Sequence, residues 1–218
     1  MPTTPNLADG DGDIAIQFEK PAAANLVSRQ LGWLHYILYA APSYLAQYGE
    51  PNAMSDLQAH QCLRLSGAEY QPESWRQAAA AWGAILPDTV GTDAGTVLME
   101  ACASGAGIAA LPSYVSQFDD RLTPLTHIKP LATLRFWLTY TERVRSMEAS
   151  QPVLHWIRSC FDPVRHPCFR EVYVPPQRRL PAGVAANDTV PATPERAPFL
   201  NAEGRPLLQG PQTNSAEG

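Results

Sequence analysis

Residues 31–51 read LGWLHYILYAAPSYLAQYGEP, and this stretch decides how the rest of the chain is interpreted. The apolar and aromatic run Tyr36–Tyr39 predicts a β-strand, and Pro42 ends it because proline has no amide hydrogen to donate to a sheet. Ser43 offers a hydroxyl oxygen to the free amides of a short helix, which Gly49 ends in a loop. The stretch therefore predicts a strand, a helix and a loop in direct succession.

The composition of the chain is that of a globular protein. Of its 218 residues 45% are hydrophobic and 17% are charged, and the net charge is −5. A negative chain without Lys/Arg runs does not wrap nucleic acid by itself. No secretory signal begins the chain, and no apolar run approaches the roughly 20 residues of a membrane helix. A cytoplasmic protein with four reduced cysteines is therefore expected.

Strand and helix patterns alternate along the first half of the chain. Strands are expected at 13–16, at 25–31 and at 62–65, and a short helix capped by Ser55 is expected at 55–60. The segment 71–84 fits either a pair of strands or a helix, because its periodicity does not separate the two.

The second half continues the alternation. A helix is expected at 92–104, with Thr92 or Asp93 as its cap. Two more helices are expected, at 113–117 after Pro112 and at 153–161. Their apolar stripes include Val97 and Val153. Strands are expected at 108–111 and 134–140, so the fold class is α/β. Residues 176–218, rich in Pro, Ala, Thr and Asn, are expected to form a disordered tail.

Several segments, in order, resemble the effector-binding domain of LysR-type transcriptional regulators. They are NLADGDGDIAIQF (6–18), LVSRQLGW (26–33), MSDLQAHQCLRLS (54–66), TDAGTVLMEACASGAGIAALPSYV (92–115), FWLTY (136–140) followed by QPVLHWIRSCFDP (151–163), and the ending FDPVRHPCFREVYVPP (161–176). The stretch from Tyr36 through Ser43 resembles the family's crossing from one lobe to the other.

The resemblance implies a periplasmic-binding-protein-like fold of type 2 with two lobes. An incomplete lobe I is expected at 1–37 and 128–175, and lobe II at 38–127. A helix-turn-helix and the start of lobe I are expected to be missing, so no direct DNA binding is expected from this chain. The implied partners are a small-molecule effector, with carboxylates as one class, and a second copy or a full-length regulator.

The start of the helix at 92–104 is the first candidate ligand site. Free amides and the positive end of a helix dipole at Thr92, Asp93 and Ala94 suit an anionic ligand. The competing interpretation is that Thr92 or Asp93 only caps its own helix, and the Asp93 charge would repel an anion.

The resemblance places two further candidates near the cleft between the lobes. Ser66 and Gly67 follow the strand at 62–65, where glycine lets a ligand approach the backbone; the competing interpretation is a simple turn. Thr139, at the end of the strand at 134–140, is expected beside the hinge, with a structural role as the alternative.

The sequence patterns do not favour a metal site or a catalytic site. Asp9–Asp13 lacks the Gly and Glu spacing of a calcium loop, and His155, Cys160, His166 and Cys168 match no zinc pattern. No nucleophile elbow, Walker loop or zinc-protease motif is present, so neither an enzyme nor a cofactor is expected. The alternative function is a solute-binding protein of the same two-lobed fold, which would require an export signal.

Overall fold

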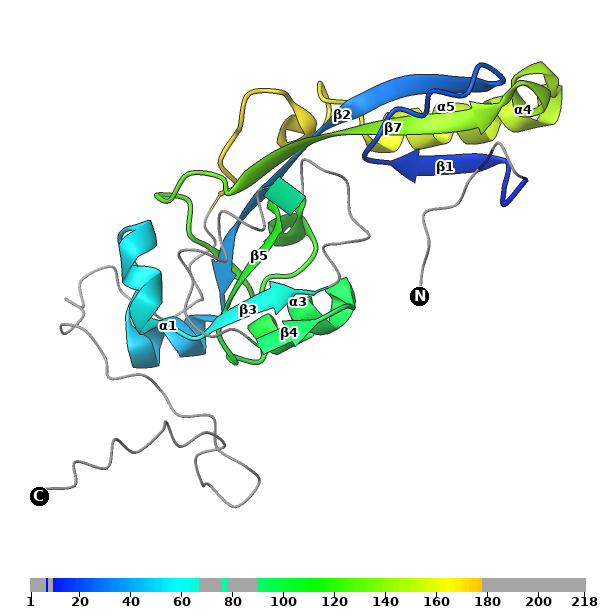
Figure 1. Cartoon of the computed structure of the whole chain (residues 1–218). Coiled ribbons are helices and arrows are strands. Elements are labelled where there is room, and N and C mark those ends of the chain that lie inside the picture. Colours follow the sequence, from blue (N-terminus) through cyan, green and yellow to red (C-terminus); the bar gives the residue numbers. More distant parts are fainter. Residues whose placement is uncertain (1–6, 8–9, 67–75, 78–89, 178–218) are drawn as a thin grey trace, which may run out of the picture.

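Two long antiparallel strands run through the centre of the structure (Figure 1). The computed structural model describes residue 7 and residues 10–66, 76–77 and 90–177. Strand β2 (Leu26–Ala40) pairs with β7 (Ala132–Thr141) from Leu26 opposite Thr141 to Tyr36 opposite Ala132, with one irregularity between Gln30 and Gly32. Because β2 extends beyond the end of β7, its last residues are free to pair with other strands.

One sheet runs through the described residues in the order β1-β7-β2-β5-β3-β4. Tyr36 marks the change of partners along β2, since it lies opposite both Ala132 of β7 and Pro112 of β5. We call the part built on β1, β7 and the first half of β2 lobe I, and the part built on the end of β2, β5, β3 and β4 lobe II. The expected division near residues 37 and 128 stays a prediction, because the sheet is continuous through it.

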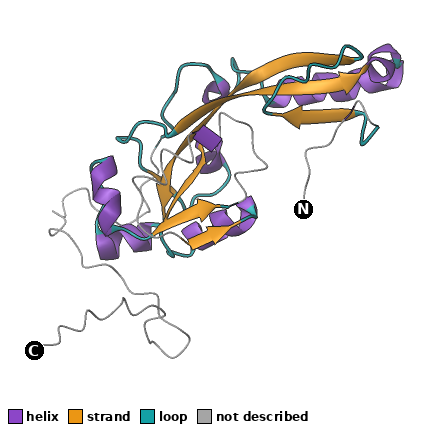
Figure 2. Cartoon of the chain, viewed as in Figure 1, coloured by secondary structure: helices purple, strands orange, loops and turns teal. Residues whose placement is uncertain are grey.

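Lobe I is a three-stranded sheet with helices on one face (Figure 2). Strand β1 (Ile14–Gln17) pairs antiparallel with β7, and α4 (Glu142–Ser146), the 3-10 turn η5 (Glu148–Ser150) and α5 (Gln151–Cys160) follow β7. Alternate β7 residues Phe136, Leu138 and Tyr140 point into a core that also contains Leu154 of α5. The period-2 alternation of β7 thus produces one apolar face, which the helices cover.

Lobe II combines antiparallel and parallel pairing. Strand β5 (Ile108–Pro112) runs antiparallel to β2, whereas β3 (Cys62–Leu65) is parallel to β5 and to β4 (Val90–Thr92). The short β6 (Thr123–Pro124) pairs with the end of β2. Helix α3 (Gly95–Ala103) buries Leu98 and Cys102 against the sheet.

Three short helices complete lobe II. Helix α1 (Pro42–Tyr48) and the 3-10 helix η2 (Met54–Ala59) bury Tyr44, Leu45 and Leu57 in a core beside the end of β2. The 3-10 helix η4 (Ser113–Gln117) directly follows β5. Within the part of the chain that the structure describes, no helix combines the length and apolarity needed to cross a membrane.

The segment after α5 lies across the middle of β2. The 3-10 turn η6 (Pro167–Phe169) places Phe169 against Phe136 and Phe161, with ring centroids 5.8 and 5.2 Å apart. Tyr173 then packs against the lobe II core. This segment therefore contacts both lobes.

The strands at 62–65, 108–111 and 134–140 are confirmed to within two residues, but 25–31 and 36–39 belong to the single strand β2. Ser43, Ser55, Thr92 and Asp93 are not helix caps, because the cap positions are Ala41, Ala53 and Ala94. Val97 and Val153 are about half exposed rather than parts of apolar stripes.

The first turns of α1 and η2 are stabilised by residues other than the expected caps Ser43 and Ser55. Pro42 begins α1 with its fixed φ, and the Asp56 carboxylate accepts hydrogen bonds from the amides of Asn52 and Ala53 at 2.9 and 3.1 Å. The expectations for most of 71–84, for Gly67 and for the tail from residue 178 lie outside the described residues.

The contact between β2 and η6 leads to a stability prediction. A Cβ atom at Gly32 would lie 2.7 Å from the Phe169 carbonyl oxygen, so Gly32→Ala must displace η6. We expect a loss of about 1–3 kcal/mol in the free energy of unfolding by urea. Gly12→Ala is the matched control, because nothing lies within 4 Å of its added Cβ. Equal stability of the two variants would show that η6 does not pack on β2 as described.

Candidate functional site at the lobe junction

The carboxyl ends of the three parallel strands of lobe II meet at the junction with lobe I. Strand β5 ends at Pro112, opposite Tyr36 where β2 changes partners, and β3 and β4 run in the same direction beside it. Ligands of α/β proteins bind beyond the carboxyl ends of such strands. The side chains that follow β3, β4 and β5 are therefore the natural candidates for a binding site.

The structure brings Ser66 and Thr92 together. The Ser66 amide donates a hydrogen bond of 2.7 Å to the Thr92 carbonyl oxygen. Gly91 permits this approach, because a Cβ atom at that position would overlap the Ser66 hydroxyl oxygen. Sequence reasoning missed Gly91, although a glycine inside a strand often marks a close approach of this kind.

Among the described residues, only some of the backbone amides at the start of α3 have a hydrogen-bond acceptor. The Thr92 hydroxyl oxygen accepts a hydrogen bond of 3.2 Å from the Ala94 amide. Ala94 itself has no side chain that could cap the helix, and Asp93 is exposed. Among the residues that the structure describes, no side-chain cap therefore occupies the amides of the first turn, which begins at Gly95.

Thr139 lies apart from this group. It is fully buried in lobe I, opposite Ser28 and Ala15, and its hydroxyl oxygen is hydrogen-bonded to Gln17 and Ser28. The expected position beside the hinge is wrong, because Ala132, not Thr139, is the end of β7 that reaches the junction. Sequence alone gave the strand but not its direction relative to the junction.

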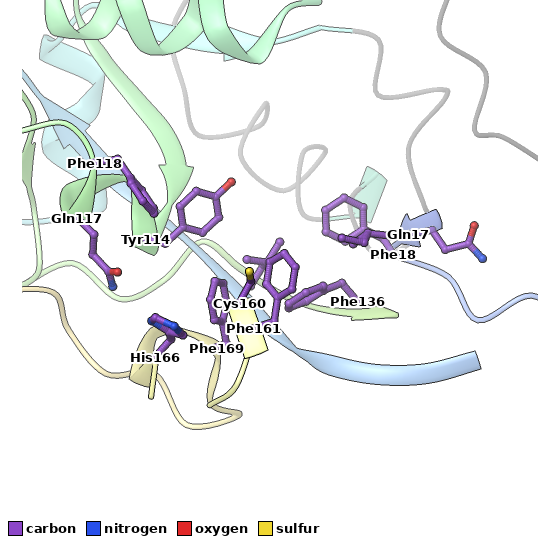
Figure 3. A pocket seen from close by; sticks show the side chains of 12 residues that line it. Gln17, Phe18, Tyr114, Gln117, Phe118, Phe136, Cys160, Phe161, His166 and Phe169 are labelled. Carbon is purple, nitrogen blue, oxygen red and sulfur yellow. The ribbon is translucent and has the colours of Figure 1, made fainter. Parts of the chain in front are cut away.

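A cavity of about 590 Å³ opens at the junction beside η4 (Figure 3). Gln17 and the following Phe18, at the end of β1, lie on one side of it. Tyr114 and Gln117 of η4 lie on the other, together with Phe118, the residue after η4.

The floor of the cavity comes from lobe I and the C-terminal segment. Phe136, Cys160, Phe161 and Phe169 supply most of it. These side chains come from β7, the end of α5, the residue after it and η6, whereas the sides come from β1 and η4. Because these elements are distant in sequence, no local motif could have revealed the cavity.

The cavity and Ser66 lie on either side of a small shared cluster of apolar residues. Phe18, which lines the cavity, and Leu65, the residue before Ser66, both pack against Ala132 and Leu134. The junction therefore has an aromatic part beside η4 and a polar backbone part at Ser66 and Thr92. Burial raises the pKa of Tyr114, so its hydroxyl stays protonated.

His35 is buried in β2 at the same junction. Its Nε2–H donates to the Arg170 carbonyl oxygen at 2.8 Å, and the Thr133 hydroxyl donates to its Nδ1 at 3.0 Å. Protonation would remove the Nδ1 acceptor. Burial accordingly lowers the pKa of His35 from its ordinary 6.5, although the Arg170 carbonyl acts in the opposite direction.

Among the described residues, no group of three or more His, Cys, Asp and Glu side chains is placed to hold a metal ion. The four cysteines are free thiols, and only Cys160 is not buried.

The fold is that of two-lobed regulatory domains resembling periplasmic binding proteins. The family model of the LysR substrate binding domain matches residues 3–161, and this chain belongs to that family. Its sequence relatives include an HTH-type transcriptional regulator of Xanthomonas campestris, 40% identical over 60 residues (28% of this chain and 17% of the relative). Another is DmlR of Escherichia coli, 23% identical over 160 residues (72% of this chain and 52% of the relative).

The solved structures agree in fold. The regulatory domain of CrgA, a LysR-type transcriptional regulator from Neisseria meningitidis, superposes with a TM-score of 0.56 at 21% identity, covering 71% of this chain and 78% of that one. The chain spans about half or less of the length of the curated relatives it matches.

The burial of His35 predicts a pH dependence. Below pH 6.5 the unfolded chain binds a proton that folded His35 resists, so stability falls as pH falls through this value and is fully present above it. Burial lowers the pKa of His60 as well, which adds the same trend. Each histidine contributes a slope of up to about 1.4 kcal/mol per pH unit.

Urea unfolding between pH 7 and pH 5 measures this slope. We expect His35→Gln and His60→Gln each to reduce it and the double variant to reduce it further. A slope that neither substitution changes would exclude these two histidines as its source.

Proposed function

We propose that this chain is the ligand-sensing effector-binding domain of a LysR-type transcriptional regulator. We further propose that it binds a small carboxylate at Ser66, Thr92, Asp93 and Ala94, with Gly67 as an adjoining residue. The observation that carries the proposal is the meeting of Ser66 and Thr92 beside the uncapped first turn of α3, at the carboxyl edge of the lobe II strands. Thr139 is not included, because its hydroxyl is occupied within lobe I.

Backbone amides are the proposed anion-binding groups. The first-turn amides of α3 have no side-chain acceptor from the cap residue, and α3 has nine residues, so its dipole favours negative charge at this end. A carboxylate of the effector would take the place that a capping side chain usually fills.

Asp93 opposes this binding by its charge. Its side chain is exposed rather than engaged at the cap, and solvent screens part of the repulsion. In this scheme Asp93 sets an upper limit on affinity and favours effectors that also carry a hydrogen-bond donor.

Binding at the junction offers a route to regulation. A ligand that contacts lobe II beside lobe I binds one lobe arrangement better than others, so it shifts the population between arrangements. We propose that the shift is passed to a second copy or a full-length regulator, and that the protein acts in the cytoplasm, where the DNA is.

Gly95→Pro tests the anion site. Proline fits the first position of a helix but has no N–H, so the variant removes one proposed donor without unfolding α3. We expect a loss of about 1–2 kcal/mol in the binding of the small carboxylate that gives the largest thermal shift in a screen. Gly95→Ala keeps the N–H and has open space for its Cβ, so its affinity should equal that of the unmodified chain.

Asp93→Asn provides a second, opposite readout. Removal of the negative charge should tighten carboxylate binding severalfold and leave the binding of the corresponding amide unchanged. If no carboxylate gives a thermal shift, or if Gly95→Pro and Gly95→Ala behave alike, the proposed anion site is incorrect.

A further inference from the structure

We propose that the aromatic cavity beside η4 is a separate binding site for an uncharged aromatic small molecule. The proposal concerns different residues from the anion site and stands on the shape and chemistry of the cavity alone. Its volume of about 590 Å³ is typical of small-molecule pockets.

The cavity wall consists largely of ring systems. Phe161 packs edge-on against both Phe136 and Phe169 with centroids 5.2 Å apart in each pair. Tyr114 lies 6.0 Å from Phe169 and 6.1 Å from Phe118. Rings at such angles present both edges and faces, and a flat aromatic ligand can continue the same packing.

The described lining offers no ionic partner of the Asp, Glu, Lys or Arg type to a charged ligand. None of the twelve described residues that line the cavity is one of these four. A carboxylate or ammonium group in this cavity would lose its hydration without gaining an ionic partner, which is strongly unfavourable. His166 lies at the edge of the group in Figure 3 and is the one histidine among the described lining residues.

The Tyr114 hydroxyl is a polar group that can orient a ligand. No described residue supplies a hydrogen-bond partner for the Tyr114 hydroxyl, which lies at the cavity in Figure 3. By contrast, the Gln17 and Gln117 amides donate to Thr139 and to the Cys168 sulfur. The Tyr114 hydroxyl can therefore donate to a carbonyl or ether oxygen of the ligand.

Phe118 gives the cavity an apolar rim. Its side chain is 82% exposed although it lines the cavity. A ligand that covers this ring removes apolar surface from water on both sides of the contact. The rim also provides a position where a substitution leaves the core intact.

A pair of fluorescent probes tests the proposal. N-phenyl-1-naphthylamine is neutral and aromatic, and 8-anilinonaphthalene-1-sulfonate has the same ring skeleton with an added sulfonate. We expect the full chain to bind the neutral probe at least about tenfold more tightly, because no Lys or Arg is among the described residues that line the cavity and could pair with the sulfonate. Equal affinities, or preference for the sulfonate, would overturn the proposal.

Substitutions at the rim locate the binding. Phe118→Ala should weaken the neutral probe by about three- to tenfold. Trp156→Ala is the matched control, because Trp156 is also a largely exposed aromatic residue but does not line the cavity. Gln117→Arg should improve the sulfonate probe by supplying a cation at the exposed edge. Equal effects of Phe118→Ala and Trp156→Ala would place the probe elsewhere and overturn the proposal.

Cys160 provides a readout independent of fluorescence. It lines the cavity and is the one cysteine that is not buried, so a maleimide should modify it first. The neutral probe should slow this modification, whereas the effect should be absent when the chain is unfolded. If the neutral probe does not protect Cys160, the proposal is contradicted. It is also contradicted if Cys160 becomes protected without probe as the protein concentration rises, because a second copy of the chain would then cover the cavity.

Different variants test the anion site at the start of α3 and the aromatic cavity. Gly95→Pro should leave the neutral probe unaffected, and Phe118→Ala should leave carboxylate binding unaffected.

Discussion

The antiparallel pairing of β2 with β7 is the constraint on which the rest of the structure depends. β7 holds the first part of β2 in lobe I as far as Tyr36, and the remaining residues of β2 pair with β5 and β6 in lobe II. A single strand therefore carries main-chain hydrogen bonds to both lobes. Because each strand residue has only two sides for pairing, the register at Tyr36 fixes where lobe I ends and where the carboxyl edge of lobe II lies.

The junction created by this pairing is chemically divided. At β3 and β4 it presents backbone amides and small hydroxyl side chains, represented by Ser66 and Thr92. Beside β5 it presents the rings of Tyr114 and Phe169. The C-terminal segment closes the aromatic part by hydrogen bonding to His35 and packing on Gly32. The two ligands that we propose, a carboxylate and an uncharged aromatic molecule, would therefore occupy neighbouring parts of one junction.

The sequence predicted the elements whose pattern is local, and it missed those that depend on distant contacts. The alternation in 134–140 and the apolar run 108–111 identify strands without tertiary information. The strands expected separately at 25–31 and 36–39 form one strand, because β7 pairs with β2 through the residues between them, a contact that the sequence pattern does not reveal. Ser43 and Ser55 are suitable caps by type, but each lies inside a helix that begins at the residue before it. The family resemblance was confirmed by the matching family model, whereas the aromatic cavity could not be foreseen, because its walls come from segments spread between residues 16 and 169.

Hydrogen exchange of the backbone amides tests the central claim most directly. If one continuous strand joins the lobes, the amides of β2 that bond to β7 and those that bond to β5 should exchange slowly and be released together as denaturant is added, as one cooperative unit. Early exchange of residues 26–34 while residues 36–40 remain protected would contradict the account, because it would show two strands in independent units rather than a single strand shared by both lobes.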